Sequence, residues 1–438
     1  MRRRLLALLA ILLISANAPS TAAGVRCKKA HASTSDQGVR FRTSGCGSTR
    51  VSAAVDRVPS TRVSAAVDRV LDQREEAIRA GNRQDFLDTI DPGADADFKA
   101  RQARLFDGLR SVPLASFDLV LRTDDVPDLS AGLEDRYAAD DVFLPPVEAR
   151  YRVEGADQDD AIDTFFYTFL LREGRWRIVS DTDLDDLGLP SARNLWDFGP
   201  VALDRSQHFA ILYNPVDKKR ARALATIAEE GYGRMAEGFD RPVPNHIVVV
   251  LPHTLDQLRE MLQVTFDLTK FVAFASASVD RDEDWRSTAP RVYVQDANLS
   301  RSRLDSQLET FHHEFVHVAS FPLAGPGIPS WIHEGVADWM GSRRPPPEPV
   351  DASDSRLPDD YEFTSGASDS IIAAYEESTS AMAFLAEKKG KTAPLDLLAR
   401  VGEARVAPGT SDYLVDQGLR AVYGAGLDDF QRDWNGGR

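Results

Sequence analysis

Residues 308–318 have the sequence LETFHHEFVHV, and they determine which fold the second half of the chain can adopt. Phe311, Phe315 and the valines beside them indicate a mostly buried helix. His313 and His317 lie four positions apart, so on a helix they project from the same face. An unpaired imidazole would be costly in such a buried position. The spacing therefore favours a pair of metal ligands over a polar surface face.

The residue after the first of these histidines supplies a group that could act on water. Glu314 stands one step around the helix from His313, so its carboxylate can reach the open coordination position of a shared ion. There it could take a proton from a water molecule and serve as a general base. Zinc accepts imidazole nitrogen in a tetrahedral arrangement, which makes zinc the ion that this motif favours.

A second predicted helix supplies the third candidate ligand. Residues 329–339 have the sequence PSWIHEGVADW, in which Ser330 is suited to cap the helix. Glu334 follows His317 at a distance that leaves room for a turn between the two helices. Three protein ligands leave one position for water, as a catalytic zinc site requires. Asp338, one helical turn beyond Glu334, could accept the second imidazole N–H of either histidine.

This joint arrangement resembles the gluzincin metallopeptidases, the group typified by thermolysin and aminopeptidase N. The His-Glu-x-x-His helix and the later Glu in a Trp-x-x-Glu-Gly-x-Ala setting both occur here. The resemblance covers roughly residues 205–436. It implies one bound Zn²⁺ and a peptide or protein substrate. It also implies the following roles: zinc ligands His313, His317 and Glu334, general base Glu314, and orienting residue Asp338.

The resemblance extends in part to aminopeptidase-N-like enzymes, whose Tyr-Glu-Lys-Gly segment supplies a tyrosine that stabilises the oxyanion. Tyr375 begins the sequence Tyr-Glu-Glu-Ser, which lacks the Lys-Gly pair. A phenol donor suits the oxyanion role, and packing at a helix start is the alternative. The Gly-x-Met-Glu-Asn segment that binds a free amino terminus is absent. Endopeptidase action therefore fits at least as well as aminopeptidase action, with Arg291–Val294 as the expected edge strand for a peptide.

Several alternatives stay open beside the catalytic interpretation. His312 lies on a different helix face from the motif, and His333 either hydrogen-bonds substrate or faces solvent. The chain could also be a non-catalytic ligand-binding protein with a degenerate metallopeptidase scaffold. A structural zinc site is the third possibility, although such sites are normally closed by four protein ligands. The intact ligand set together with Glu314 favours catalysis.

Residues 1–23 are expected to be a signal peptide rather than part of the fold. Three arginines precede an apolar run from Leu5 to Ser15, and small residues then suit cleavage after Ala18 or Ala23. The run is shorter than the ~20 residues of a spanning helix. We therefore expect a secreted or extracytoplasmic protein without stable membrane insertion. An uncleaved N-terminal anchor is the alternative.

The remaining chain divides by composition and periodicity into a linker and two domains. Residues 24–60 are rich in Gly, Ser, Thr and Arg, which predicts a flexible linker. Its two cysteines, Cys27 and Cys46, could form a disulfide or be incidental thiols. Helical periodicity followed by strand-like runs over residues 61–185 resembles the nuclear transport factor 2-like fold, a cone of helices and antiparallel sheet. Residues 205–438 would form the metallopeptidase domain with a mainly helical C-terminal part, so the predicted fold class is α+β.

Strand boundaries and charge complete the sequence-based expectations. One strand is expected over Ala161–Leu171, and Glu173-Gly174 is expected to turn the chain into the next strand. Residues 342–369 form a long loop rich in Pro, Asp and Ser, which either borders the cleft or is disordered. The formal net charge of -16 argues against nucleic-acid binding. The oligomeric state is not indicated.

Overall fold

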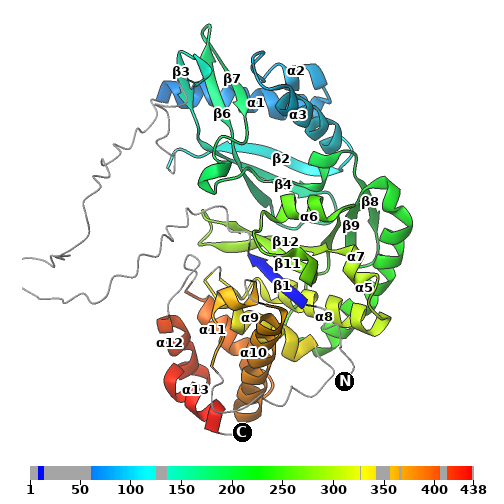
Figure 1. Ribbon diagram of the computed structural model, residues 1–438, viewed down its shortest axis with the longest axis vertical. Helices are drawn as coiled ribbons and strands as arrows, with labels where there is room; N and C mark the ends of the chain where they lie inside the picture. The colour runs from blue at the N-terminus through cyan, green and yellow to red at the C-terminus, as the bar shows by residue number, and fades with distance from the viewer. Residues whose placement is uncertain are drawn as a thin grey trace, which may run out of the picture.

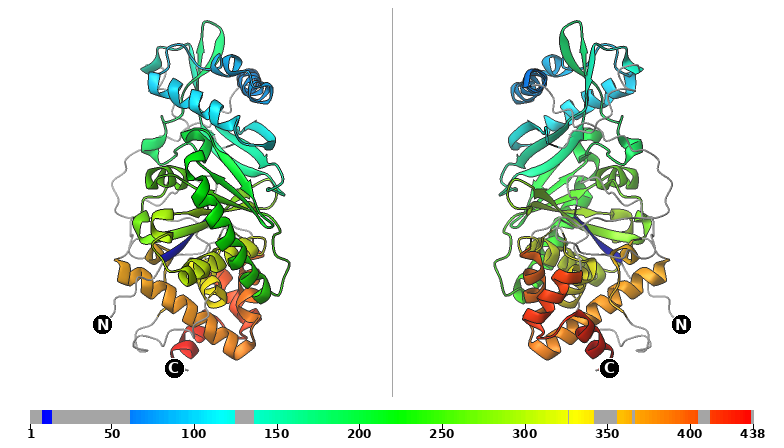
Figure 2. Two further views of the ribbon diagram at one scale, coloured as in Figure 1. Left: turned by 90° about the vertical axis from the view of Figure 1, so that its right-hand side faces the viewer. Right: turned by 90° about the vertical axis from the view of Figure 1, so that its left-hand side faces the viewer.

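The structure, a computed structural model, describes residues 8–13, 61–124, 136–325, 327–341, 356–364, 367–404 and 412–436. The expected linker with both cysteines, and most of the expected loop over residues 342–369, lie outside the described residues. The described part is α+β, which confirms the predicted fold class. Two small antiparallel sheets with helices lie at one end, a mixed sheet lies in the middle, and helices form the other end (Figure 1, Figure 2).

The first half is built from helices followed by antiparallel strands. Its elements are α1 (Thr61–Ala80), α2 (Arg83–Leu87), α3 (Ala96–Leu109), β2 (Leu114–Leu121), β3 (Asp141–Phe143), β4 (Pro146–Val153), β5 (Ala161–Phe166), β6 (Thr168–Arg172) and β7 (Arg175–Ser180). The strand orders are β2-β4-β5 and β3-β6-β7. Val67, Leu71 and Ile78 recur at helical spacing on the buried face of α1. Asp95 begins α3 by accepting hydrogen bonds from the backbone amides of Asp97 and Phe98.

The prediction of one continuous strand over Ala161–Leu171 is wrong. The chain forms β5 and β6 instead, and these strands belong to different sheets. The break falls at Tyr167, whose ring centroid lies 5.3 Å from that of Phe165 and 6.2 Å from that of Phe169. Because side chains on both sides of the break are buried, the apolar run continues through it without a turn residue.

The predicted hairpin turn between β6 and β7 is confirmed. Glu173 and Gly174 adopt φ angles of 52° and 73°, the left-handed conformation that a tight two-residue hairpin turn requires. Arg172 and Arg175 pair directly on either side of the turn.

A mixed sheet forms the middle layer of the molecule. Its strands are β1 (Leu8–Leu13), β8 (Ala202–Arg205), β9 (Phe209–Tyr213), β10 (Ile247–Leu251), β11 (Phe271–Asp280) and β12 (Arg286–Val294). Their order is β1-β11-β12-β10-β9-β8. Every residue of β9 and β10 is buried, as expected of parallel strands covered on both faces. The strand β1 falls within the expected signal peptide and pairs parallel with β11.

The expectation that Arg291–Val294 forms an edge strand is wrong. These residues end β12, which lies inside the sheet between β11 and β10. The Arg291 side chain is buried. Its two terminal nitrogens donate to the two carboxylate oxygens of Asp157 at 2.8 and 2.9 Å, an ion pair between the two halves of the chain. The Asp157 carboxylate takes the place of water as the partner of the Arg291 guanidinium, so the strand can lie inside the sheet.

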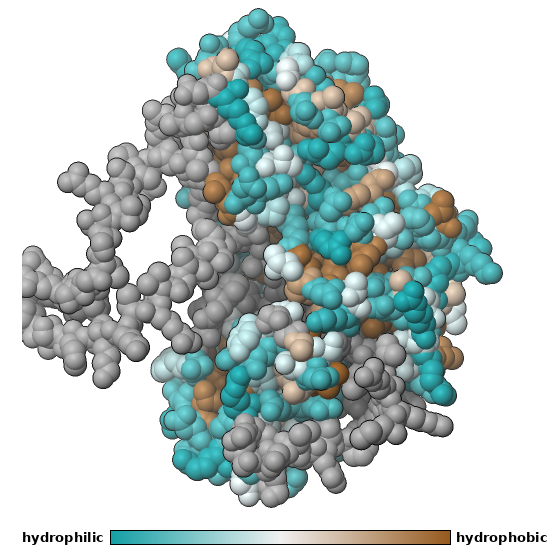
Figure 3. Space-filling model, in the orientation of Figure 1, coloured by the Kyte–Doolittle hydropathy of each residue, from teal (hydrophilic) through white to brown (hydrophobic). Residues whose placement is uncertain are grey.

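Helices dominate the chain after the sheet. They are α5 (Lys218–Gly238), α6 (Leu255–Leu262), α7 (Asp296–Leu299), α8 (Leu304–Ser320), α9 (Ser330–Gly341), α10 (Ser368–Lys389), α11 (Ala393–Gly402), α12 (Asp412–Val422) and α13 (Leu427–Gly436). Among the helices that the structure describes, none combines the length and the apolar character needed to cross a membrane. The face drawn in Figure 3 is mostly hydrophilic, with apolar residues gathered at the level of α6 and the mixed sheet.

The two halves share a continuous hydrophobic core. One cluster of buried side chains includes Phe86 and Tyr151 from the first half as well as Phe209 from the mixed sheet. The short helix η2 (Leu195–Phe198) joins them, because Trp196 is buried with its ring centroid 5.2 Å from that of Tyr151. A Cβ atom on Gly108 of α3 would lie 2.0 Å from the Trp196 carbonyl oxygen, so only glycine permits this contact. The segment that connects the halves is therefore part of the core.

Asp157→Ala should lower the free energy of unfolding by about 3–5 kcal/mol, because Arg291 would stay buried without its charge partner. Asp159→Ala is the matched control. Its pair with Arg286 spans 3.4 Å, and the two side chains are 44% and 40% exposed. We expect the control to change the free energy of unfolding by less than about 1 kcal/mol. Urea denaturation measures both variants, and equal effects would contradict the assignment of a stabilising role to the buried pair.

Candidate metal centre

The helix α8 lies at the centre of the second half and carries the His-Glu-x-x-His motif. It contacts α5, α9, β11 and β12. Its apolar side chains Phe311 and Phe315 are fully buried. Close packing against α5 depends on Gly231, where an added Cβ would lie 2.7 Å from the Phe311 Cβ. The surroundings of α8 therefore leave the polar side chains of the motif without access to bulk water.

Three side chains converge between α8 and α9. The Nε2 atoms of His313 and His317 lie 2.9 Å apart. Glu334 Oε2 lies 3.2 Å from the first of these nitrogens and 3.4 Å from the second. Ligand atoms bound at ~2.0–2.1 Å around a tetrahedral ion are separated by about 3.3 Å. The His313, His317 and Glu334 side chains could therefore hold a metal ion.

Polar atoms around this group also fit an ion and its open position. The exposed fractions of His313, His317 and Glu334 are 1%, 0% and 2%. Among the described residues, neither carboxylate oxygen of Glu314 has a hydrogen-bond partner, and the same holds for the Tyr375 hydroxyl. Buried polar atoms normally have partners, so these atoms indicate a site that a ligand and water would complete.

Asp338 orients one of the two imidazoles. Its Oδ1 atom lies 2.7 Å from His313 Nδ1, on the ring side opposite the shared group. The sequence left either histidine open as its partner, and the structure places His313 there. Thr379 Oγ1 of α10 lies 3.3 Å from the other Asp338 oxygen and 2.8 Å from the Tyr375 carbonyl oxygen, and its one proton is shared between these two acceptors. Burial alone would lower the pKa of His313, but the Asp338 and Glu334 carboxylates raise it to about 10.

Glu314 lies beside the group but is not one of its three members. Its side chain is fully buried, and burial raises its pKa to about 8, although His313 offsets part of the rise. The backbone of Ala275 in β11 also lies close enough to lower this pKa in part. A carboxylate with a raised pKa, next to an open coordination position, can accept a proton near neutral pH.

Tyr375 reaches the site from α10, a helix that begins at Ser368, within the last residues of the predicted loop. Its ring centroid lies 6.5 Å from that of His313, and burial followed by the Glu334 carboxylate raises the pKa of the phenol. Close approach of α10 depends on Gly335, where a Cβ would lie 2.7 Å from the Ser378 carbonyl oxygen. The phenol therefore stays protonated and can donate a hydrogen bond into the site.

The two histidines with open roles are both buried. His333 does not face solvent, because it is 2% exposed and its ring centroid lies 5.0 Å from that of His317. Its Nε2 atom lies 3.3 Å from Ser320 Oγ. His312 is 8% exposed and is not a member of the candidate metal group.

Two contributors to the site were not found from the sequence. Thr379 gives no motif signal, although its spacing of one helical turn from Tyr375 could have indicated a shared face. Ala275 acts through its backbone, and a backbone contact leaves no trace in residue type.

Comparison with known proteins adds no relative to these observations. No protein-family model matches the sequence, and no curated protein shows a significant match to it. The site itself is consistent with a gluzincin-like His-Glu-x-x-His and Glu arrangement, since the buried His313, His317 and Glu334 group has that spacing and geometry. The group makes the chain a candidate metallohydrolase.

Asp338→Asn should weaken Zn²⁺ binding by about 10–100-fold, because a neutral amide holds the imidazole N–H of His313 less firmly than a carboxylate does. His317→Ala, which removes a ligand, should abolish stoichiometric binding. Asp369→Asn, on the exposed start of α10, is the control and should bind Zn²⁺ like the wild type. Competition with a chromophoric chelator gives the affinities. Wild-type binding by the Asp338 variant would contradict the orienting role.

Proposed function

We propose that the chain is an exported zinc metallopeptidase that hydrolyses peptide bonds. The observation that carries this proposal is the buried His313, His317 and Glu334 group with the unpartnered carboxylate of Glu314 beside it. Two imidazoles and one carboxylate are the protein ligands of a well-known class of catalytic zinc sites. A structural zinc site would normally have a fourth protein ligand in place of the open position.

Each polar side chain of the site has a task in this reaction. When bound, the zinc ion supplies Lewis-acid polarisation of a water molecule and of the scissile carbonyl. Glu314 takes the proton from the attacking water and delivers it to the amine that leaves. Tyr375 donates its phenolic O–H to the negative charge that develops on the carbonyl oxygen. Asp338 keeps the His313 ring in the orientation that ligation requires.

The outer edge of β11 is the surface along which we expect an extended peptide to lie. This strand contacts α8, and its backbone at Ala275 lies near Glu314. In the structure the edge pairs with the chain's own segment Leu8–Leu13, which also contacts α8 and α9. An edge that accepts one extended segment through backbone hydrogen bonds can accept another. Removal of the expected signal peptide would free the edge for a substrate.

Glu314→Gln should lower kcat for hydrolysis of a peptide substrate by about 10²–10⁴-fold, because the amide cannot accept the proton of the attacking water. The variant should still bind one Zn²⁺ per chain, because the three ligands remain. Asp305→Asn on the exposed start of α8 is the matched control and should retain full activity. A fluorogenic peptide library supplies the substrate. Full activity of the Glu314 variant, or a wild type that binds Zn²⁺ but cleaves no peptide, would contradict the proposed function.

Tyr375→Phe should lower kcat by about 10²–10³-fold with little change in KM, because the hydroxyl acts on charge that is present only in the transition state. The buried ring and its packing against Phe363, at a centroid distance of 5.2 Å, are kept. Steady-state kinetics on the same peptide measures the two constants. A variant with unchanged kcat would assign the tyrosine to packing alone.

A further inference from the structure

The hairpin of β11 and β12 connects the candidate metal centre to the first half of the chain. At the level of Ala275 the strand β11 lies against α8, which carries Glu314. Five residues later β11 ends at Asp280, where the chain contacts β4 of the first half. The same strand therefore borders the site and meets the other half of the molecule.

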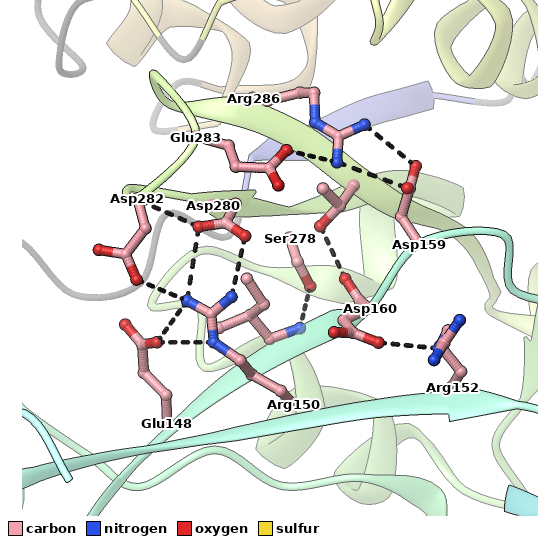
Figure 4. A network of polar contacts seen from close by, with 12 residues as sticks. Glu148, Arg150, Arg152, Asp159, Asp160, Ser278, Asp280, Asp282, Glu283 and Arg286 are labelled. Carbon is pink, nitrogen blue, oxygen red and sulfur yellow. Dashed lines mark hydrogen bonds and ion pairs between the residues drawn. The ribbon is translucent and has the colours of Figure 1, made fainter. Parts of the chain in front are cut away.

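Arg150 of β4 is the centre of this contact (Figure 4). Its guanidinium donates to Asp280 Oδ2 at 2.9 Å and to Asp282 Oδ2 at 3.0 Å. It also donates to Glu148 Oε2, on its own strand, at 2.9 Å. Glu148 and Asp280 are only 5% and 7% exposed, so the contact is largely shielded from solvent. Removal of one partner from such a network leaves buried charge uncompensated.

A second arginine holds the tip of the same hairpin. Arg122, which follows β2, donates to both oxygens of Asp282 at 2.8 and 3.1 Å. Asp282 is 53% exposed, so this pair is weaker than the buried contact of Arg150 with Asp280. Arg122 alone would therefore leave the end of β11 less firmly fixed.

Neutral hydrogen bonds join β5 and the residue before it to both strands of the hairpin. Ser278 Oγ of β11 accepts the backbone N–H of Ile162 at 2.9 Å. Thr288 Oγ1 of β12 donates to the Asp160 carbonyl oxygen at 2.8 Å. Figure 4 shows that these bonds lie between the two guanidinium clusters of Arg150 and Arg286.

The hairpin needs this external support because its own ladder is irregular. The pairing of β11 with β12 shifts register between Ser276 and Ser278. Asp284, Trp285 and Ala289 all have positive φ angles, of 52°, 58° and 43°. Non-glycine residues in that region persist only where surrounding contacts hold them. An unsupported hairpin of this kind would move, and β11 would move with it.

We propose that Arg150 is a positioning residue that holds β11 in place beside α8 and Glu314, and that the first half of the chain is thereby an obligatory part of the peptidase. This inference rests on the proposed function for its catalytic consequence. Its structural part, the attachment of β11 to β4 through one guanidinium, stands on the contacts alone.

Hydrogen–deuterium exchange of the full-length protein tests the attachment directly. Arg150→Met should raise exchange in residues 271–280 by at least about tenfold, because charge-assisted hydrogen bonds to Asp280 and Asp282 are lost. Arg152→Met is the matched control. Arg152 lies on the same face of β4, is 44% exposed, and pairs with Asp160 of its own half at 2.9 Å. Unchanged exchange of residues 271–280 in the Arg150 variant, or an equal rise in the control, would overturn the proposal.

Kinetics and metal binding separate positioning from general stability. Arg150→Met should lower kcat/KM on peptides by about 10²-fold, as small displacements of site elements do, while Zn²⁺ affinity stays at the wild-type value. Arg150→Lys, which keeps the charge but not the fork of donors, should lie between the wild type and the methionine variant in both exchange and kinetics. Loss of Zn²⁺ binding in parallel with activity would overturn the positioning role.

The two proposals fail in different ways. Hydrogen–deuterium exchange does not depend on catalysis. A wild type without peptidase activity would refute the proposed function. The exchange of residues 271–280 would still decide whether Arg150 holds β11. Full activity of Arg150→Met, in a chain that cleaves peptides, would refute the positioning role alone.

Discussion

Burial of two imidazoles and two carboxylates between α8, α9 and β11 is the constraint on which the second half of the molecule depends. His313, Glu314, His317 and Glu334 are each at most 2% exposed, and such groups cost several kcal/mol when they are left without partners. A shared ion would offset this cost for His313, His317 and Glu334, because metal coordination would replace the water that these groups lose on burial. The neighbouring helices also have to pack closely around this group. Glycine at 231 lets α5 approach α8, and glycine at 335 lets α9 approach α10, since a Cβ at either place would collide with the adjoining helix.

The same constraint explains why the two halves of the chain are not independent layers. A site closed on its helical side must be formed on its other side by the sheet, and β11 is the strand nearest to α8. The pairing of this strand with β12 shifts register between Ser276 and Ser278, and contacts with β4 and β5 add to the pairing beyond that point. The buried pair of Asp157 and Arg291 extends the connection to β12. The mixed sheet is therefore held by the first half of the chain on one side, and it borders the candidate metal centre on the other.

The sequence predicted which residues form the candidate metal group better than it predicted the arrangement of the strands around them. Helical spacing alone places His313, His317 and Glu314 correctly, because the geometry of one helix determines their relation. The choice of His313 as the partner of Asp338 depends on how α9 rotates against α8, and tertiary packing decides that rotation. The interior position of Arg291–Val294 and the break at Tyr167 were missed for a related reason: apolar periodicity reports burial but not which strand pairs with which.

In the proposed function, a substrate has to reach this closed site. The helices α8, α9 and α10 pack closely against one another at glycine residues. Separating these helices would disrupt the core that holds His313, His317 and Glu334 in place. The remaining boundaries are the outer edge of β11, which pairs with Leu8–Leu13, and the short helix η5 (Asp360–Phe363), whose Phe363 packs on Tyr375. The short helix η5 is attached to the start of α9 by a hydrogen bond of 2.7 Å from the Ser330 amide to Asp360, and it also contacts α10. In the proposed function, an extended chain would enter between β11 and η5, next to the unpartnered polar atoms of Glu314 and Tyr375.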